Sequence, residues 1–121
     1  MRDPNRLQVF QLADALVLDV HAFTRAFPPD ERFGLTAQLR RAVVSIASNL
    51  VEGCSRDSPR EFAQFVRQAL GSALEVQYQL SLATRLGYGP KEIATPTAAR
   101  ASSLAKRLNV LARTIPLSKR T

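Results

Sequence analysis

The sequence contains few of the residues from which enzymes and membrane proteins build their sites. Among 121 residues there is no tryptophan, one histidine (His21) and one cysteine (Cys54). A single cysteine cannot form an internal disulfide, and one cysteine with one histidine cannot complete a zinc site. No apolar run reaches the ~18 residues of a transmembrane helix, and the charged segment 1–6 does not resemble a signal peptide. We therefore expect a cytoplasmic protein with no metal, no cofactor and no membrane partner.

Common catalytic motifs are also missing. The sequence has no Gly-x-Ser-x-Gly elbow, no P-loop and no Glu-x-x-His motif. Cys54 lies at the apolar end of an expected helix, where a cysteine usually packs as a small hydrophobic residue. His21 is expected on the surface, and no spacing brings Glu52 and Glu75 together as an acid and base pair. The sequence thus favours a protein that is not an enzyme and has no small-molecule substrate.

Basic residues clearly outnumber acidic ones. Lysine and arginine total 17 against 10 aspartate and glutamate residues, which gives a net charge of +7 and a pI near 10.8. Between Ala94 and Thr121 there is no acidic residue. The basic residues of this last quarter are Arg100, Lys106, Arg107, Arg113, Lys119 and Arg120. Such a surface attracts polyanions, usually nucleic acid, although net charge alone fits equally well a surface that only keeps the protein soluble.

Apolar residues recur at helical spacing in four segments of the chain. Pro28 and Pro29 end the first segment, because the residue before a proline is pushed out of the helical region. The connections between the segments are short, which predicts an all-α, antiparallel up-down-up-down four-helix bundle. The expected helices cover about residues 8–27, 35–54, 59–86 and 96–115, within a single domain of residues 1–121.

The third helix has the clearest boundary signals. Residues 58–61, Ser-Pro-Arg-Glu, combine a capping box with proline at the first helical position. Gly87 is well placed to end the helix. Gly71 in its interior costs about 1 kcal/mol relative to alanine. This favours a close approach of another helix; the alternative is a weak position that the helix tolerates.

The fourth helix is less regular. Thr95 and Pro96 resemble a cap and a first helical position, and Pro116 is expected to end the helix, with a frayed tail to Thr121. Its apolar stripe consists of Leu104, Leu108, Leu111 and Ile115.

The second helix has an unusually wide apolar surface. When its residues are placed ~100° apart, the polar ones fall within a strip ~100° wide. That strip consists of Gln38, Arg41, Ser45, Ser48, Asn49 and Glu52. Apolar residues, extended by Val44, Ala47 and Val51, cover more than half of the circumference. A helix on the outside of a monomeric bundle needs less, so this helix is either central or covered on a second side by another subunit.

Two groups of polar residues are candidates for function. Asn49 and Glu52 adjoin the apolar surface of the second helix, where we favour a hydrogen-bonded network that fixes helix register or subunit geometry. The residues expected to contact phosphates of nucleic acid are Arg40, Arg41, Arg56, Arg60, Lys106, Arg107 and Arg113. For Arg41, Arg56 and Arg60 a structural role fits equally well. With two tyrosines and no tryptophan, base stacking is not favoured, and phosphate contact without sequence reading is the expected mode.

Three stretches of the chain resemble a known family. The stretch from Phe33 to Gly53 is similar to the central signature of the four-helix bundle proteins encoded in intervening sequences of bacterial 23S ribosomal RNA genes. Glu61-Phe62 with Phe65, followed by residues 69–75, resembles the second signature of this family, and residues 86–88 resemble the third. The likeness covers about residues 7–88, with a weaker match over the last helix.

The resemblance implies an antiparallel four-helix bundle, assembly into a homopentamer and association with nucleic acid. A related branch is the basic, pentameric accessory protein of diversity-generating retroelements, which works with a reverse transcriptase and nucleic acid. This chain has Phe10 where the family often has tryptophan, and its last helix contains Pro96 and lacks the usual acidic residues. We therefore expect a non-enzymatic, homo-oligomeric protein associated with RNA or DNA. The alternative is a protein–protein scaffold or accessory subunit that docks through the second helix and does not contact nucleic acid.

Overall fold

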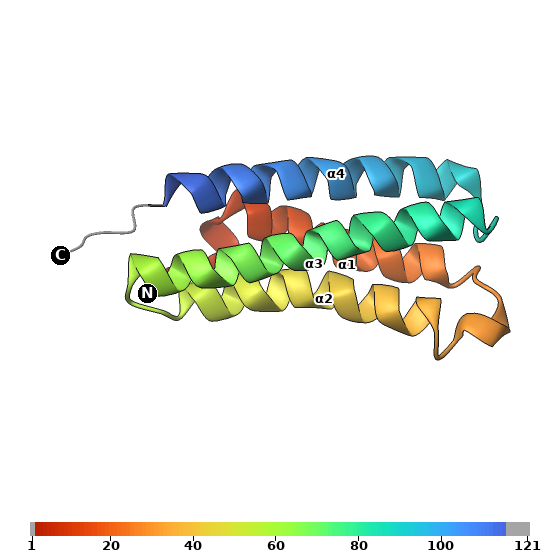
Figure 1. The fold of residues 1–121 in the computed structure, drawn as a ribbon, viewed down its shortest axis with the longest axis horizontal. Coiled ribbons are helices and arrows are strands. Elements are labelled where there is room, and N and C mark those ends of the chain that lie inside the picture. Colours follow the sequence, from red (N-terminus) through yellow and green to blue (C-terminus); the bar gives the residue numbers. More distant parts are fainter. Residues whose placement is uncertain (1, 116–121) are drawn as a thin grey trace.

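The computed structural model describes residues 2–115, which form an all-α fold (Figure 1). The α-helices of this range are α1 (Gln8–Thr24), α2 (Leu35–Cys54), α3 (Pro59–Arg85) and α4 (Lys91–Thr114). Two short 3₁₀ helices, η1 (Pro4–Arg6) and η2 (Pro29–Glu31), precede α1 and α2. Consecutive α-helices run in opposite directions, so the predicted antiparallel four-helix bundle is confirmed.

In cross-section, the four α-helices occupy the corners of a square. α1 and α3 each contact α2 and α4, whereas within residues 2–115 no Cα atoms of the diagonal pairs lie within 8 Å of each other. Because the helices alternate in direction, the starts of α1 and α3 lie at the same end of the bundle as the ends of α2 and α4 (Figure 1). We call this end the N-terminal end. The α1–α2 and α3–α4 loops lie at the opposite end.

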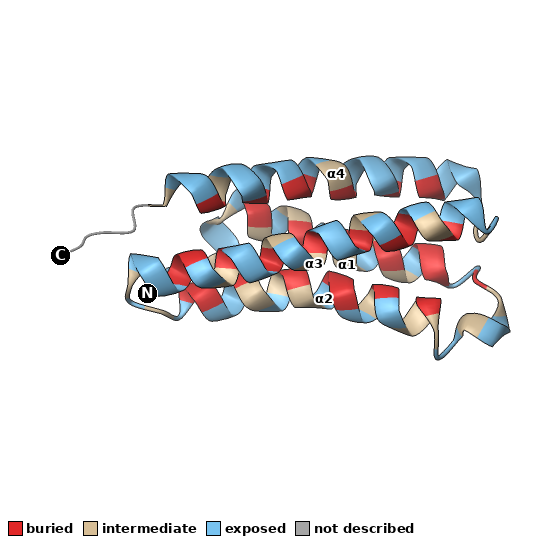
Figure 2. Cartoon of the chain, in the orientation of Figure 1, coloured by how far each residue is buried: buried red, intermediate tan, exposed pale blue. Residues whose placement is uncertain are grey.

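Each helix buries one apolar stripe at the centre of the square, and Figure 2 shows the buried positions on the inward faces. In α2, Leu39, Ile46 and Leu50 follow helical spacing and are completely buried. Their partners from the other helices include Leu16, Val20, Val66, Val76, Leu104 and Leu108. The periodicity of the sequence therefore identifies the core.

α3 begins and ends as its sequence signals predict. Ser58 Oγ accepts a hydrogen bond from the Glu61 amide at 3.2 Å and so caps the first turn. At the other end Gly87 adopts a φ of +78°, which glycine tolerates best. The amides of Gly87 and Tyr88 donate to carbonyls of the last turn in a Schellman motif.

The first helix ends earlier than predicted. α1 stops at Thr24 instead of near Phe27, because the amides of Ala26 and Phe27 bond three residues back and tighten the chain before the two prolines. The predicted helix end at Pro116 and the frayed tail to Thr121 lie outside the described residues.

The fourth helix begins earlier than predicted. α4 starts at Lys91, and Pro96 lies inside it instead of at its first position. The missing proline amide leaves the Glu92 carbonyl without a helical donor, but both residues are exposed, so water can satisfy that carbonyl. Burial of Ala94 and Thr97 against the bundle outweighs the local preference to start the helix later.

Glu31 joins the two loops at the opposite end of the bundle. Its Oε1 accepts a hydrogen bond from the Leu35 amide at 3.0 Å, and its Oε2 accepts one from the Tyr88 hydroxyl at 2.8 Å. The hydrogen bond from the Leu35 amide, followed by the hydrogen bond from the Tyr88 hydroxyl, lowers the pKa of Glu31 from its ordinary value of 4.5. The bond to Glu31 also raises the pKa of Tyr88 from its ordinary value of 10.0.

We expect Glu31→Gln to reduce the free energy of unfolding at neutral pH, because an amide cannot offer two charged acceptor oxygens to the two donors. A lowered folded pKa means that this contribution is present above the unfolded pKa, near 4.5, and is lost as the pH falls through the folded pKa. Urea unfolding should therefore separate the variant from the wild type at neutral pH and bring them together in acid. Asp30→Asn, at the exposed neighbouring carboxylate, is the control. A difference that persists unchanged in acid would contradict this role of Glu31.

Candidate functional site

The structure brings five of the predicted phosphate-contacting residues to the N-terminal end of the bundle. Lys106, Arg107 and Arg113 lie in the second half of α4, and Arg60 lies in the first turn of the adjacent helix α3. Arg56 lies in the connection that leads from α2 into α3 at the same end. Their closeness follows from the antiparallel order, since α3 begins where α4 ends.

Arg40 and Arg41 lie instead in the first half of α2, toward the opposite end. The Arg40 guanidinium donates to Thr24 Oγ1 at 2.8 Å and to the His21 carbonyl at 3.5 Å. It thereby stabilises the last turn of α1, where the helix dipole favours a cation. Arg41 is exposed and lines a small polar depression between α2 and α3, together with Glu75. Neither arginine adjoins the basic residues of the N-terminal end.

Arg56 is held by its neighbours. Its Nη2 donates to Glu52 Oε2 at 2.6 Å, and its guanidinium lies 5.1 Å from the centre of the Phe65 ring. Both charged groups remain partly exposed, so the ion pair adds little to stability. Arg56 therefore orders the turn before α3 and is less available to a phosphate than the exposed Arg60.

Asn49 forms hydrogen bonds with Ser45, one turn earlier in α2. Its Nδ2 donates to the Ser45 carbonyl at 2.9 Å and to Ser45 Oγ at 3.1 Å. Ser45 Oγ in turn lies 2.9 Å from Ser72 Oγ of α3. The Ser45–Ser72 hydrogen bond links α2 to α3, whereas the two bonds of Asn49 lie within α2. Glu52 has its bond with Arg56 and not with these residues.

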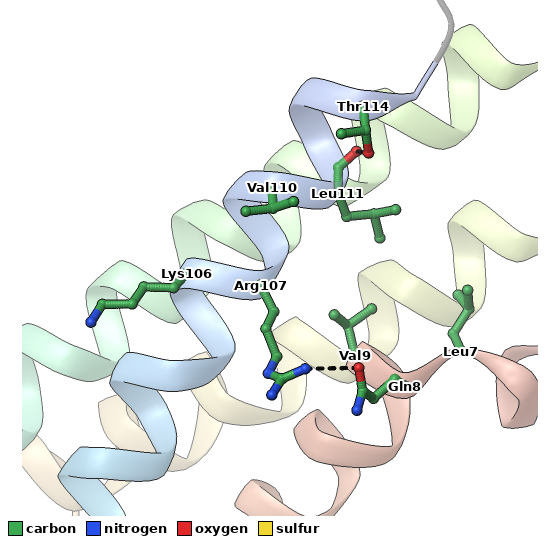
Figure 3. A pocket seen from close by; sticks show the side chains of 8 residues that line it. All are labelled: Leu7, Gln8, Val9, Lys106, Arg107, Val110, Leu111 and Thr114. Carbon is green, nitrogen blue, oxygen red and sulfur yellow. Dashed lines mark hydrogen bonds between the residues drawn. The ribbon is translucent and has the colours of Figure 1, made fainter.

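A groove of about 430 Å³ lies between the start of α1 and the end of α4 (Figure 3). Its lining residues are Leu7, Gln8, Val9, Lys106, Arg107, Val110, Leu111 and Thr114. Arg107 reaches toward α1 and donates through Nη1 to Gln8 Oε1 at 2.8 Å. The groove thus combines an apolar floor with two cations, and no carboxylate lines it.

A second groove, of about 500 Å³, lies on the other side of α4, against α3. Arg67 and Arg113 line it beside Leu70, Ala112 and Ile115, again without a carboxylate. The reasoning from sequence missed Arg67. Two signals could have identified it: Arg67 follows Arg60 after two helical turns, and α3 has no acidic residue from Phe62 to Leu74.

These exposed residues form a set of five cations on α3 and α4, and four of them line the two grooves that flank α4. We call it the basic cluster; its members are Arg60, Arg67, Lys106, Arg107 and Arg113. α4 has no acidic residue after Glu92, so no carboxylate of that helix neutralises the cluster. Exposed cations beside apolar grooves can neutralise and position an anionic polymer.

Cys54, the single cysteine of the chain, has the wrong environment for a catalytic nucleophile. Cys54 is buried, and this burial raises the pKa of its thiol, which is the opposite of what an activated nucleophile needs. Within residues 2–115 no three His, Cys, Asp or Glu side chains gather where they could hold a metal ion. In the same range, no helix has the length and apolar character to cross a membrane.

Comparison with known proteins agrees with this fold. A solved structure of a protein of unknown function from the S23 ribosomal protein family, from Bacteroides thetaiotaomicron, is 22% identical to this chain. The two structures match with a TM-score of 0.77 over 88% of this chain and 99% of that chain. No curated protein matches this chain. The family profile of the 23S rRNA-intervening sequence protein matches residues 5–110, and the chain therefore belongs to this family.

Proposed function

We propose that this protein is a non-enzymatic homo-oligomer that binds RNA or DNA by contacting phosphates through the basic cluster. The observation that carries the proposal is the gathering of five exposed cations on adjacent helices, beside two grooves that no carboxylate lines. The family resemblance favours five copies. Five chains with a net charge of +7 each would carry +35, which supports strong, salt-dependent phosphate binding.

The proposed contact is with the backbone of the nucleic acid and not with its bases. Reading bases in single strands usually requires exposed aromatic side chains beside the cations. The most exposed aromatic residues, Phe33 and Tyr78, lie in the η2–α2 turn and near the end of α3, away from the basic cluster. Binding should therefore vary little with sequence.

A protein–protein scaffold is the second candidate. Val44 and Val51 of α2, together with Leu74 and Tyr78 of α3, leave apolar surface exposed on the single chain. Such a surface favours contact with protein and offers nothing to a phosphate. It is compatible with the first candidate if copies of this same chain cover it.

The experiment that tests nucleic-acid binding is fluorescence anisotropy with labelled single-stranded RNA, duplex RNA and duplex DNA over a series of salt concentrations. We expect the logarithm of the binding constant to fall linearly with the logarithm of salt concentration, with a slope near −0.9 for each phosphate neutralised on duplex DNA. Absence of binding even at low salt would overturn the proposal and leave the scaffold as the better candidate.

A further inference from the structure

We propose that the groove between α1 and α4 binds a short helical segment of another protein, with apolar side chains on one face and carboxylates beside them. This inference goes beyond the proposed function and does not require that nucleic acid binds. It accounts for the apolar half of the groove, which contact with phosphates leaves unexplained.

The groove offers an apolar surface that the described chain leaves open. Leu111 of α4 and Val9 of α1 point into the space between the two helices (Figure 3). Val110 follows Lys106 by one helical turn and stays 59% exposed at the rim of the groove. Removing such surface from water is the main favourable contribution to protein association.

The polar groups of the groove favour an anionic partner. Lys106 and Arg107 contribute two cations, and no carboxylate of residues 2–115 lines the groove. The Gln8 side chain already accepts a hydrogen bond through Oε1 from Arg107, so its amide Nε2 remains to donate. A ligand therefore meets chiefly N–H donors, and a carboxylate is the protein side chain that matches them best.

Two arginines on the same side of α4 show what Arg107 lacks. Arg100 also reaches across to α1, where its Nε donates to Asp19 Oδ2 at 2.8 Å and forms an ion pair. Arg107 reaches across at the same distance but bonds to the neutral amide of Gln8. That bond orients the Arg107 guanidinium without neutralising it, so a carboxylate from a partner completes the pair at a reduced entropic cost.

The shape of the groove favours a helical peptide over other occupants. From Lys106 to Thr114, α4 lines it for about 12 Å, or about two helical turns, and an amphipathic helix packs well along such a groove. A free acyl chain needs an enclosed pocket, whereas Val110 is open to solvent. The chain's own segment 116–121 carries Lys119 and Arg120 and no acidic residue, so its charge disfavours it beside Lys106 and Arg107.

The test is fluorescence anisotropy of the full chain with three labelled peptides of about 15 residues, long enough to form a helix. The first has leucines at three- and four-residue spacing and glutamates beside them. The second has alanine in place of leucine, and the third has lysine in place of glutamate. We expect the first to bind at least about tenfold more tightly than the second, because both carry the same charge, and we expect no binding of the third.

Val110→Gln separates peptide binding from nucleic-acid binding, because it removes an apolar contact without changing the charge. We expect it to weaken binding of the leucine–glutamate peptide about five- to tenfold and to leave RNA affinity unchanged. Ile93→Gln is the matched control: Ile93 is another exposed apolar residue of α4, 38% exposed, in the first turn of the helix. It should change neither affinity.

Gln8→Glu provides Arg107 with a carboxylate from its own chain, as Asp19 does for Arg100. We expect this variant to bind the leucine–glutamate peptide about tenfold more weakly, because the internal carboxylate replaces that of the ligand. Thermal stability should be kept or raised, because a carboxylate in the first turn of α1 interacts favourably with the helix dipole.

Three results would overturn the inference. Equal binding of the leucine and alanine peptides would show that charge alone attracts them. Unchanged peptide affinity in Val110→Gln would remove the apolar surface from the site. A wild type that binds no peptide, together with a lower molar mass of Val110→Gln in sedimentation equilibrium, would mean that a second copy of the chain covers the groove. RNA affinity is measured separately, so failure of this inference is distinguishable from failure of the proposed function.

Discussion

Gly89→Ala should lower the free energy of unfolding by about 2–5 kcal/mol. Gly89 has a φ of +75°, where any other L-residue costs about 1–2 kcal/mol. A Cβ there would also lie only 2.4 Å from Cε1 of Phe23. That ring is completely buried and packs edge-on against Phe27 with centroids 5.1 Å apart, so it cannot move aside freely. Overpacking of this kind costs about 1–3 kcal/mol more.

Gly87→Ala is the matched control for this effect. Gly87 has nearly the same backbone conformation, with a φ of +78°, but a Cβ there would meet no atom within 4 Å. The free energy of unfolding of this variant should therefore fall only by the conformational cost of about 1–2 kcal/mol. Urea unfolding of the two variants separates strain from packing. Equal losses would mean that the α3–α4 loop does not pack on Phe23 as described.

The helical elements could be predicted because their signals are local. The cap at Ser58 depends on a residue three positions away, and the apolar stripe through Leu39, Ile46 and Leu50 depends only on helical spacing. The start of α4 could not be read in the same way. Pro96 is a strong local signal for a first turn, but burial of Ala94 against the rest of the bundle favours a helix that begins before this proline.

The candidate site was predictable only in part. The absence of acidic residues after Glu92 identified α4 as basic from composition alone. Arg67 joins the cluster because α3 packs beside α4, and that pairing does not appear in a linear sequence. Arg40 was expected to contact phosphates, yet its guanidinium donates to Thr24, which lies 16 residues earlier on another helix. Contacts between distant segments decide which arginines remain available.

Reversing the charge of the first groove, with Lys106→Glu and Arg107→Glu together, should weaken nucleic-acid binding about 10- to 100-fold at low salt. The loss should be the same for all sequences, because phosphate contacts carry no sequence information. The salt dependence should also become shallower, by about 1 in slope for each contact removed. The double variant Arg67→Glu with Arg113→Glu should weaken binding to a similar extent if the nucleic acid also contacts the second groove.

The matched control is Arg25→Glu with Arg32→Glu, two exposed arginines near the opposite end of the bundle. This pair changes the net charge by the same amount, so any general attraction of a basic protein to a polyanion falls equally. Only a local contact makes the two double variants differ. A larger loss from the α4 pair, with folding checked by circular dichroism, therefore assigns phosphate contact to the basic cluster. Equal losses would mean that net charge alone draws the polymer, and unchanged affinity in the α4 pair would remove that helix from the site.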